Sequence, residues 1–93
     1  MGALNKDQIV ELFHREAIMI DDRDVVPKFR INRLFGKEAT EFADRLSNRR
    51  YSSCYGVGDY MLHYMTYPGF LIAASYYNVQ QVRGDDHEQS ASL

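Results

Sequence analysis

The chain divides into a charged half and an aromatic half, and this division limits the folds open to it. Ten of the eleven lysine and arginine residues lie within the first 50 positions, whereas all seven tyrosines lie between Tyr51 and Tyr77. From Tyr51 up to Arg83 the only formal charge is Asp59. Charged residues keep one face of a helix in water, whereas tyrosine buries a large ring and needs a partner for its hydroxyl. We therefore expect amphipathic helices in the first half and a half-buried contact surface in the second.

A chain of 93 residues, 45% of them hydrophobic, is large enough for one core and too apolar to be disordered. We expect one compact domain over residues 1–83 and an acidic flexible tail over residues 84–93. The single cysteine, Cys54, allows no internal disulfide and favours a reducing compartment. A cytoplasmic protein is predicted, because charges interrupt the first apolar run as they would not in a signal peptide. No membrane span is expected, since the neutral stretch 60–79 holds five tyrosines and a Pro-Gly pair.

The first helix has the clearest signals. Asn5 is a good N-cap residue, and Gln8 follows at the position that completes a capping box. Leu4 and Ile9 occupy the two positions of a hydrophobic staple. Apolar residues then recur at helical spacing, so the pattern predicts a helix from about Lys6 to Ile20.

An extended segment and a second helix are expected next. Pro27 disfavours helical geometry in the residue before it, which predicts a connector or short edge strand over residues 25–33. Apolar residues then return to helical spacing, with acids early and arginines late, as the helix dipole favours. This pattern predicts a helix from about Lys37 to Asn48. The helix side of the core is expected to contain Leu4, Ile9, Leu12, Phe13, Phe42 and Leu46.

The aromatic half allows two interpretations. Tyrosine favours strands, and residues 60–65 and 70–79 flank Pro68-Gly69, which together predict a hairpin. Alternatively, Pro68 begins a helix that Gly84 ends. We favour the hairpin, and so an α+β fold in which two amphipathic helices pack on a small antiparallel sheet made from residues 52–80. The alternative is an all-α fold of four short helices.

Aromatic and methionine residues outnumber what one small core can hold. The helices already offer about nine apolar residues, and a chain of this size fully buries only about fifteen to twenty side chains. Several tyrosines are therefore expected at the surface, where an exposed aromatic patch marks an interface. The predicted interface residues are Tyr55, Tyr60, Tyr64, Met65, Tyr67, Tyr76 and Tyr77.

A basic segment suggests a second kind of partner. Residues 28–50 carry a net charge of +4, between segments 1–27 and 84–93 that each carry −3. Such a segment with interleaved aromatic residues could follow a phosphate backbone, although the acidic composition of the whole chain argues against dedicated nucleic-acid binding. The residues of this alternative are Lys28, Arg30, Arg33, Arg45, Arg49 and Arg50.

Two further clusters contain residue types that occur in catalytic or metal sites. Asp59 and His63 lie four residues apart and Cys54 precedes them, which gives the residue types of a small Cys/His enzyme. No catalytic signature surrounds them, however, and a strand would turn Cys54 away from Asp59. Glu11 and His14 have the spacing of a di-iron helix, but such a site needs a second copy of the motif and two further glutamates facing it, which only a dimer could supply. We therefore expect no catalytic residues, no metal site and no cofactor.

The composition as a whole predicts a small non-enzymatic binding or regulatory protein, similar in character to an inhibitor or an adaptor. Its expected partners are a second copy of itself, in a homodimer or higher homo-oligomer, and another protein. Nucleic acid is the alternative partner, and a Cys/His enzyme is the third possibility.

Overall fold

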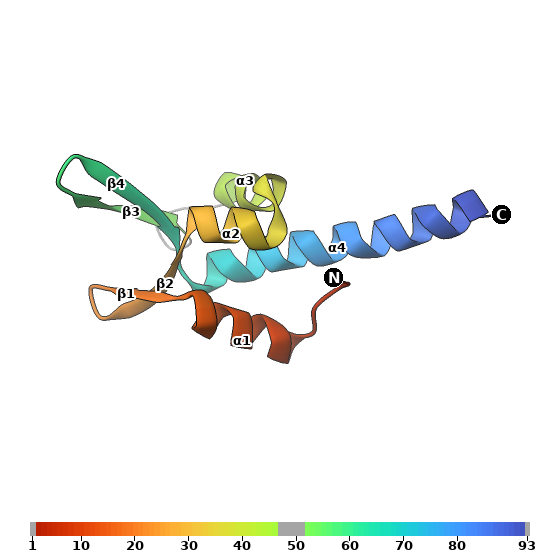
Figure 1. The fold of residues 1–93 in the computed structure, drawn as a ribbon, viewed down its shortest axis with the longest axis horizontal. Helices are drawn as coiled ribbons and strands as arrows, with labels where there is room; N and C mark the ends of the chain where they lie inside the picture. Colours follow the sequence, from red (N-terminus) through yellow and green to blue (C-terminus); the bar gives the residue numbers. More distant parts are fainter. Residues whose placement is uncertain (1, 47–51, 93) are drawn as a thin grey trace.

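A computed structural model of the chain describes residues 2–46 and 52–92. Within these residues, four helices accompany a four-stranded antiparallel sheet, so the fold is α+β as predicted (Figure 1). The all-α alternative is wrong, because four segments of the chain pair as strands. No helix of the described part is long and apolar enough to cross a membrane.

Helix α1 (Lys6–Glu16) begins as predicted and ends early. The Asn5 side chain accepts a hydrogen bond from the Gln8 backbone at 2.8 Å, and the Gln8 side chain accepts one from the Asn5 backbone at 2.9 Å. This completes the predicted capping box. The predicted end at Ile20 is wrong, because the last three residues of that range form strand β1 (Ile18–Ile20). Two β-branched isoleucines favour the paired strand over a further helical turn.

Strand β1 pairs with β2 (Arg23–Pro27) in a hairpin that closes through Asp21 and Asp22. Both aspartates have positive φ, 52° and 62°. A two-residue type I′ turn requires such values at both central positions.

Helix α2 (Lys28–Phe35) follows β2 directly and corrects the predicted connector. Only the part of residues 25–33 up to Pro27 is extended. Ile31 and Phe35 lie one helical turn apart and are buried on the same side, and this burial favours the helix. Gly36, with φ of 93°, ends it.

Helix α3 (Lys37–Leu46) matches the second predicted helix at its start. Residues 47 and 48, which the prediction includes, lie outside the described residues. Ala39 and Ala43 are fully buried, but Phe42 is only half-buried and Leu46 is 54% exposed. The prediction that Leu46 belongs to the core is therefore wrong.

The predicted hairpin of residues 60–65 and 70–79 is wrong in its second strand, because residues 70–79 are helical and the partner of residues 60–65 is residues 52–57. Strands β3 (Ser52–Val57) and β4 (Tyr60–Met65) pair about Gly58-Asp59, and helix α4 (Tyr67–Ser92) follows. Pro68 therefore lies in the first turn of α4, where its missing N–H breaks no hydrogen bond, and the predicted turn at Pro68-Gly69 is wrong. The helix continues through residues 84–92, and the flexibility expected there stays a prediction.

The sheet has the strand order β1-β2-β4-β3 and two distinct faces. The inner face packs on the helices, because Val26 and Met65 belong to the main core with Phe13 and Phe70. The outer face carries a small second cluster of Ile20, Val25 and Tyr64, with Ile18 and Leu62 packed against it.

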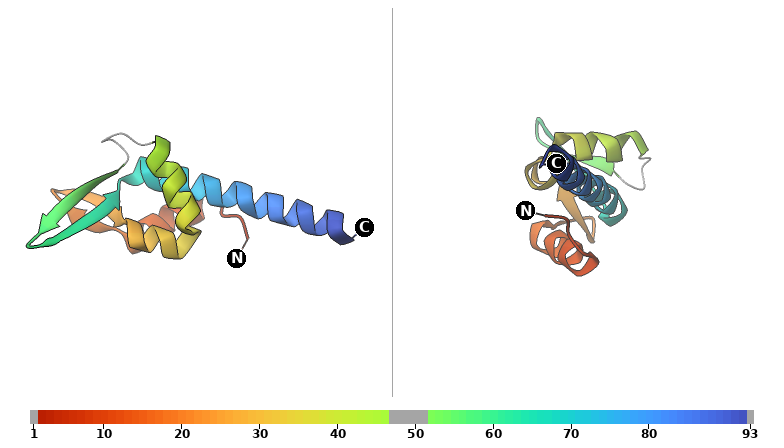
Figure 2. Two further views of the ribbon diagram at one scale, coloured as in Figure 1. Left: turned by 90° about the horizontal axis from the view of Figure 1, so that it is seen from above. Right: turned by 90° about the vertical axis from the view of Figure 1, so that its right-hand side faces the viewer.

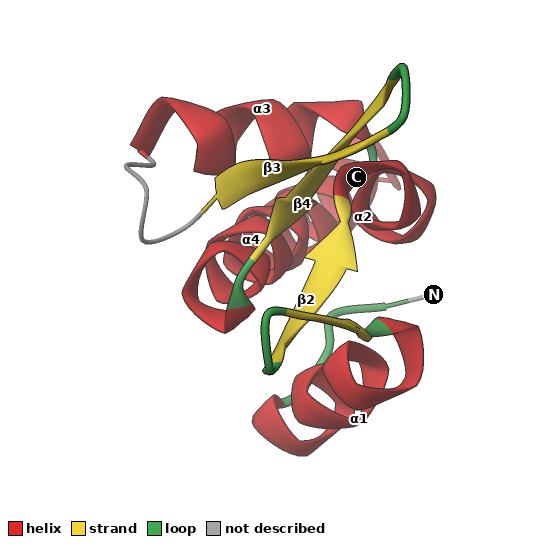
Figure 3. Cartoon of the chain, turned by 90° about the vertical axis from the view of Figure 1, so that its left-hand side faces the viewer, coloured by secondary structure: helices red, strands yellow, loops and turns green. Residues whose placement is uncertain are grey.

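The two hairpins project from one end of the molecule, away from the C-terminal end of α4 (Figures 1 and 2). Helices α1 and α3 lie on opposite sides of α4, as the view onto the hairpin end shows (Figure 3). Strands β2 and β4 pair only at their bases, through Val26 with Met65 and Pro27 with Tyr64. The outer part of the β3–β4 hairpin therefore reaches beyond the helices.

Candidate binding surface

The outer face of the β3–β4 hairpin exposes two of the predicted interface residues. Tyr55 is 44% exposed and Tyr60 is 60% exposed. Tyr55 lies opposite Leu62 in the pairing of the strands, and Tyr60 is two positions from Leu62 along β4. Since paired residues and residues two apart share a face, the two tyrosines are diagonal neighbours on the outer face. We call this pair the hairpin aromatic surface.

Tyr64 and Met65, also predicted for the interface, are packed inside the chain at the base of β4. They are 3% and 0% exposed, so in this structure they offer almost no area to a partner. The Tyr64 hydroxyl accepts a hydrogen bond from the Arg23 guanidinium at 3.2 Å, and that guanidinium lies 5.9 Å from the ring centroid. Arg23 thus satisfies the hydroxyl of a buried tyrosine and links the two hairpins.

The three tyrosines of α4 are half-buried and pack on three other helices. Their ring centroids lie 4.9, 5.0 and 5.3 Å from those of phenylalanines in α1, α3 and α2, in the pairs Tyr67–Phe13, Tyr76–Phe42 and Tyr77–Phe35. The Tyr76 hydroxyl also donates to Glu38 at 3.3 Å. These rings hold α4 against its neighbours and leave only part of their area for a partner.

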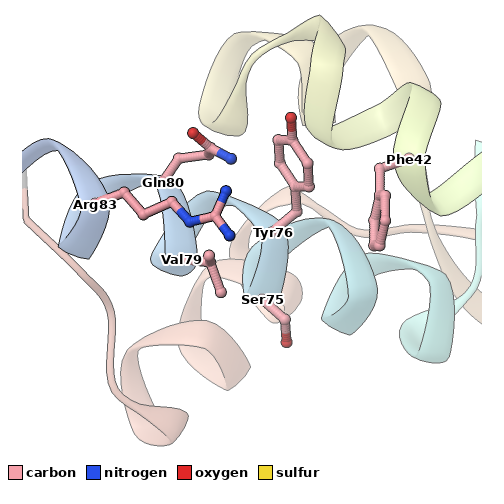
Figure 4. A pocket seen from close by; sticks show the side chains of 6 residues that line it. All are labelled: Phe42, Ser75, Tyr76, Val79, Gln80 and Arg83. Atoms are coloured by element: carbon pink, nitrogen blue, oxygen red, sulfur yellow. The ribbon is translucent and has the colours of Figure 1, made fainter.

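A shallow groove runs between α3 and α4. Figure 4 shows Phe42 and Tyr76 side by side at one end, with Val79 and Arg83 at the other. Val79 is 49% exposed, so the groove is apolar and open. It could hold an apolar side chain, but it brings together no group able to carry out chemistry.

Most of the described residues of the basic segment are engaged within the chain. Lys28 forms an ion pair with Asp44 at 2.7 Å. Arg30 donates to the Glu16 backbone carbonyl at 2.9 Å, and Arg33 lies 3.5 Å from the Glu16 carboxylate. These contacts fasten α2 to α1 and α3. Of the other predicted residues, Arg45 is exposed, while Arg49 and Arg50 lie outside the described residues.

The candidate Cys/His residues are brought together only in part. Cys54 and His63 are directly paired across β3 and β4, so both side chains lie on the inner face. Asp59 lies in the turn of the hairpin. The alternation of side chains along a single strand predicts only that Cys54 turns away from Asp59. Pairing of β3 with β4 brings Cys54 opposite His63 instead.

Glu11 and His14 are exposed on α1. Among the side chains that the structure describes, which end at residue 83, no group of three His, Cys, Asp or Glu is arranged to hold a metal ion.

Two residues near the hairpin were missed as surface candidates. Phe29, 53% exposed at the start of α2, borders a hollow with Met61 of β4. Met19 of β1 is 68% exposed. Phe29 was assigned to a connector, and a helical reading of residues 28–35 would have placed it opposite the buried Ile31.

Comparison with known proteins gives no relative: no protein-family model, no curated protein and no solved structure matches the chain.

Proposed function

We propose that this chain is a small non-enzymatic binding protein, of inhibitor or adaptor type, that pairs with a second copy of itself through strand β3. The pair then presents its joined aromatic surface to another protein. The observation that carries the proposal is the hairpin aromatic surface, Tyr55 and Tyr60, beside an outermost strand that bears no charge.

The first support is the chemistry of the outer face. An antiparallel sheet with helices on one face normally carries polar residues on the other, because that face meets water. Here the outer face carries Ile18, Leu62, Tyr55 and Tyr60, all at least partly exposed. Tyrosine is enriched in protein interfaces, because its ring gives contact area and its hydroxyl tolerates a wet rim.

The second support is the edge of the sheet. Outermost strands present backbone groups that pair with other strands, and proteins block this pairing with lysine, proline or a bulge. Strand β3 is the last strand of the described sheet, and its sequence Ser-Ser-Cys-Tyr-Gly-Val contains neither charge nor proline. A charged strand paired with β3 would place its charges beside the neutral side chains of β3. The partner strand is therefore expected to be neutral as well. Strand β3 of a second copy meets that condition and closes a two-fold assembly.

The pairing geometry also favours two copies. In an antiparallel pair, directly opposed residues point to the same face, so a two-fold axis through β3 can place Tyr55 opposite Tyr55 of the second copy. A cross-strand aromatic pair of this kind contributes roughly 0.2 to 1 kcal/mol. Both sets of helices then lie on one side of the joined sheet, and four tyrosines form a continuous surface on the other.

The nucleic-acid alternative draws less support. Lys28, Arg30 and Arg33 would have to leave contacts to Asp44 and Glu16 before they could bind phosphate. Binding would therefore cost part of the packing of α2.

The test is the mass of the chain in solution at tens of micromolar, by sedimentation equilibrium or light scattering. The parent is expected to have twice the mass of a single 10.8-kDa chain. Tyr55→Lys should reduce the mass to that of one chain, because two lysines would face each other across the axis. The matched control is Val82→Lys on α4, at a valine that is 52% exposed, which should leave the pair intact. A parent mass of one chain would overturn the proposal.

A further inference from the structure

Two soft sulfur donors and one imidazole share the inner face of the β3–β4 hairpin. Cys54 is paired with His63, and Gly56 is paired with Met61. Paired residues in an antiparallel sheet have their Cβ atoms about 4.5 to 5.5 Å apart, and residues two apart on a strand share a face. The thiol, the imidazole and the thioether therefore form a triangle on one patch of sheet.

The thioether lies over a glycine. A Cβ atom placed on Gly56 would lie 4.0 Å from Met61 Sδ and 3.8 Å from Met61 Cε. Met61 therefore crosses from β4 to β3, beside the position that Cys54 occupies two residues earlier. Because Gly56 has no side chain, the flexible methionine has room to swing its sulfur towards the thiol.

The patch is open, and the lysine that borders it is already paired. Cys54 and His63 are exposed, and Met61 is 50% exposed. Lys28 borders the same hollow as Met61 and His63, but its ammonium is held 2.7 Å from the Asp44 carboxylate. An arriving cation would thus meet Met61 and His63 beside a lysine that is already paired, with Cys54 directly across the strands from His63.

We propose that Cys54, Met61 and His63 bind one Cu(I) ion. Thiolate and thioether sulfur select Cu(I), and imidazole binds copper well. Zn²⁺ prefers four ligands from Cys, His, Asp and Glu, and the described residues hold no group of three of these. On coordination the Cys54 thiol gives its proton to solvent, while copper stays Cu(I) throughout.

The site does not depend on the proposed pairing of two copies. The hairpin aromatic surface lies on the outer face and the three donors lie on the inner face. The monomeric Tyr55→Lys variant should therefore bind Cu(I) as the parent does. Failure of copper binding in a dimeric parent would overturn this inference alone.

The experiment is an anaerobic titration of the full chain with Cu(I), in excess ascorbate, against a coloured Cu(I) chelator. One copper per chain is expected. Loss of a residue that only supports a metal ligand weakens binding roughly 10- to 100-fold. Loss of a ligand itself should weaken copper binding by more than this. We expect this for Cys54→Ser, Met61→Leu and His63→Gln. Met19→Leu, at a methionine 68% exposed on β1, is the matched control and should bind as the parent does.

X-ray absorption of the copper complex separates a thioether ligand from a neighbouring bystander. The parent should show two sulfur atoms and one nitrogen atom around copper, and Met61→Leu should show one sulfur fewer. Circular dichroism of each variant establishes that the hairpin is folded. The inference is overturned if Met61→Leu keeps the affinity and sulfur count of the parent, if the parent binds no copper, or if it prefers Zn²⁺ to Cu(I).

Discussion

Phe13 is the residue at which the first helix meets the last. Its ring contacts Tyr67 and Phe70 edge to face, with centroids 4.9 and 5.4 Å apart, and only 4% of it is exposed. Aromatic pairs in this geometry add to the burial of apolar area. The position was predicted for the core from the spacing of the first helix, and the structure confirms it.

Phe13→Ala should lower the free energy of unfolding by about 3 to 5 kcal/mol, because it leaves a cavity between α1 and α4. Chemical denaturation gives the value. Phe29→Ala removes the same ring from a site that is 53% exposed and should cost far less. Similar losses for the two variants would contradict the placement of α1 on α4.

Asn78 fastens the N-terminal segment to α4. Its side-chain amide donates to the Leu4 carbonyl and its oxygen accepts from the Leu4 N–H, both at 2.8 Å. One side chain thus satisfies both backbone groups of Leu4, as a neighbouring strand would. The sequence gives no sign of this contact, which joins residues 74 positions apart.

Asn78→Leu should lower the free energy of unfolding by about 1 to 3 kcal/mol, because it leaves two backbone groups without partners. Hydrogen exchange of the Leu4 amide should accelerate at the same time. Gln80→Leu, at an exposed position on the same helix, is the control and should change neither quantity. An unchanged Leu4 exchange rate in Asn78→Leu would show that the contact contributes nothing.

Among the elements, the β1–β2 hairpin carries the clearest backbone strain. Asp21 and Asp22 both adopt positive φ, which costs an L-residue free energy that glycine does not pay. The second central position of such a turn is where glycine is most often found.

Asp22→Gly should therefore raise the free energy of unfolding, by about 1 kcal/mol or less. Asp24→Gly makes the same chemical change inside β2, where glycine weakens a strand, and should lower it. Thermal unfolding of the two variants beside the parent decides the sign. A destabilised Asp22→Gly would mean that the aspartate side chain stabilises the turn more than its φ strains it.

Local signals predicted those elements whose stability is local. The capping box of Asn5 and Gln8 fixed the start of α1, and it is confirmed. The end of α1 could not be predicted in this way, because Ile18–Ile20 become a strand only through pairing with β2. The turn of the β3–β4 hairpin did have a signal, since Gly58-Asp59 is a two-residue turn sequence with positive φ at the glycine. The turn was instead predicted at Pro68-Gly69, because proline and glycine are also frequent in turns.

The alternation of side chains along β4 was predictable once a strand was assumed. Tyr60, Leu62 and Tyr64 share one face, while Met61, His63 and Met65 share the other, as predicted. Exposure along those faces was not predictable. Tyr64 is covered because the β1–β2 hairpin meets β4 at its base, and this pairing joins residues about 40 positions apart.

For the molecule as a whole, the division of the sequence into two halves does not become a division in space. The charged half supplies β1 and β2, which join the strands of the aromatic half in one sheet, and α4 of the aromatic half packs among α1, α2 and α3. The basic residues were expected as a surface, but Lys28, Arg30 and Arg33 fasten helices together. The sequence shows where the basic residues are, but it does not show which acidic residue or carbonyl group each one will contact in the fold.

The central claim, that β3 pairs with a second copy, is tested most directly by hydrogen exchange of the β3 amides at two protein concentrations. Alternate amides of β3 bond to β4, and the others point to the open edge. We predict that the edge amides are protected at tens of micromolar and lose protection on dilution, while the amides bonded to β4 keep theirs. Edge amides that exchange at the rate of an unpaired chain at both concentrations would contradict the account.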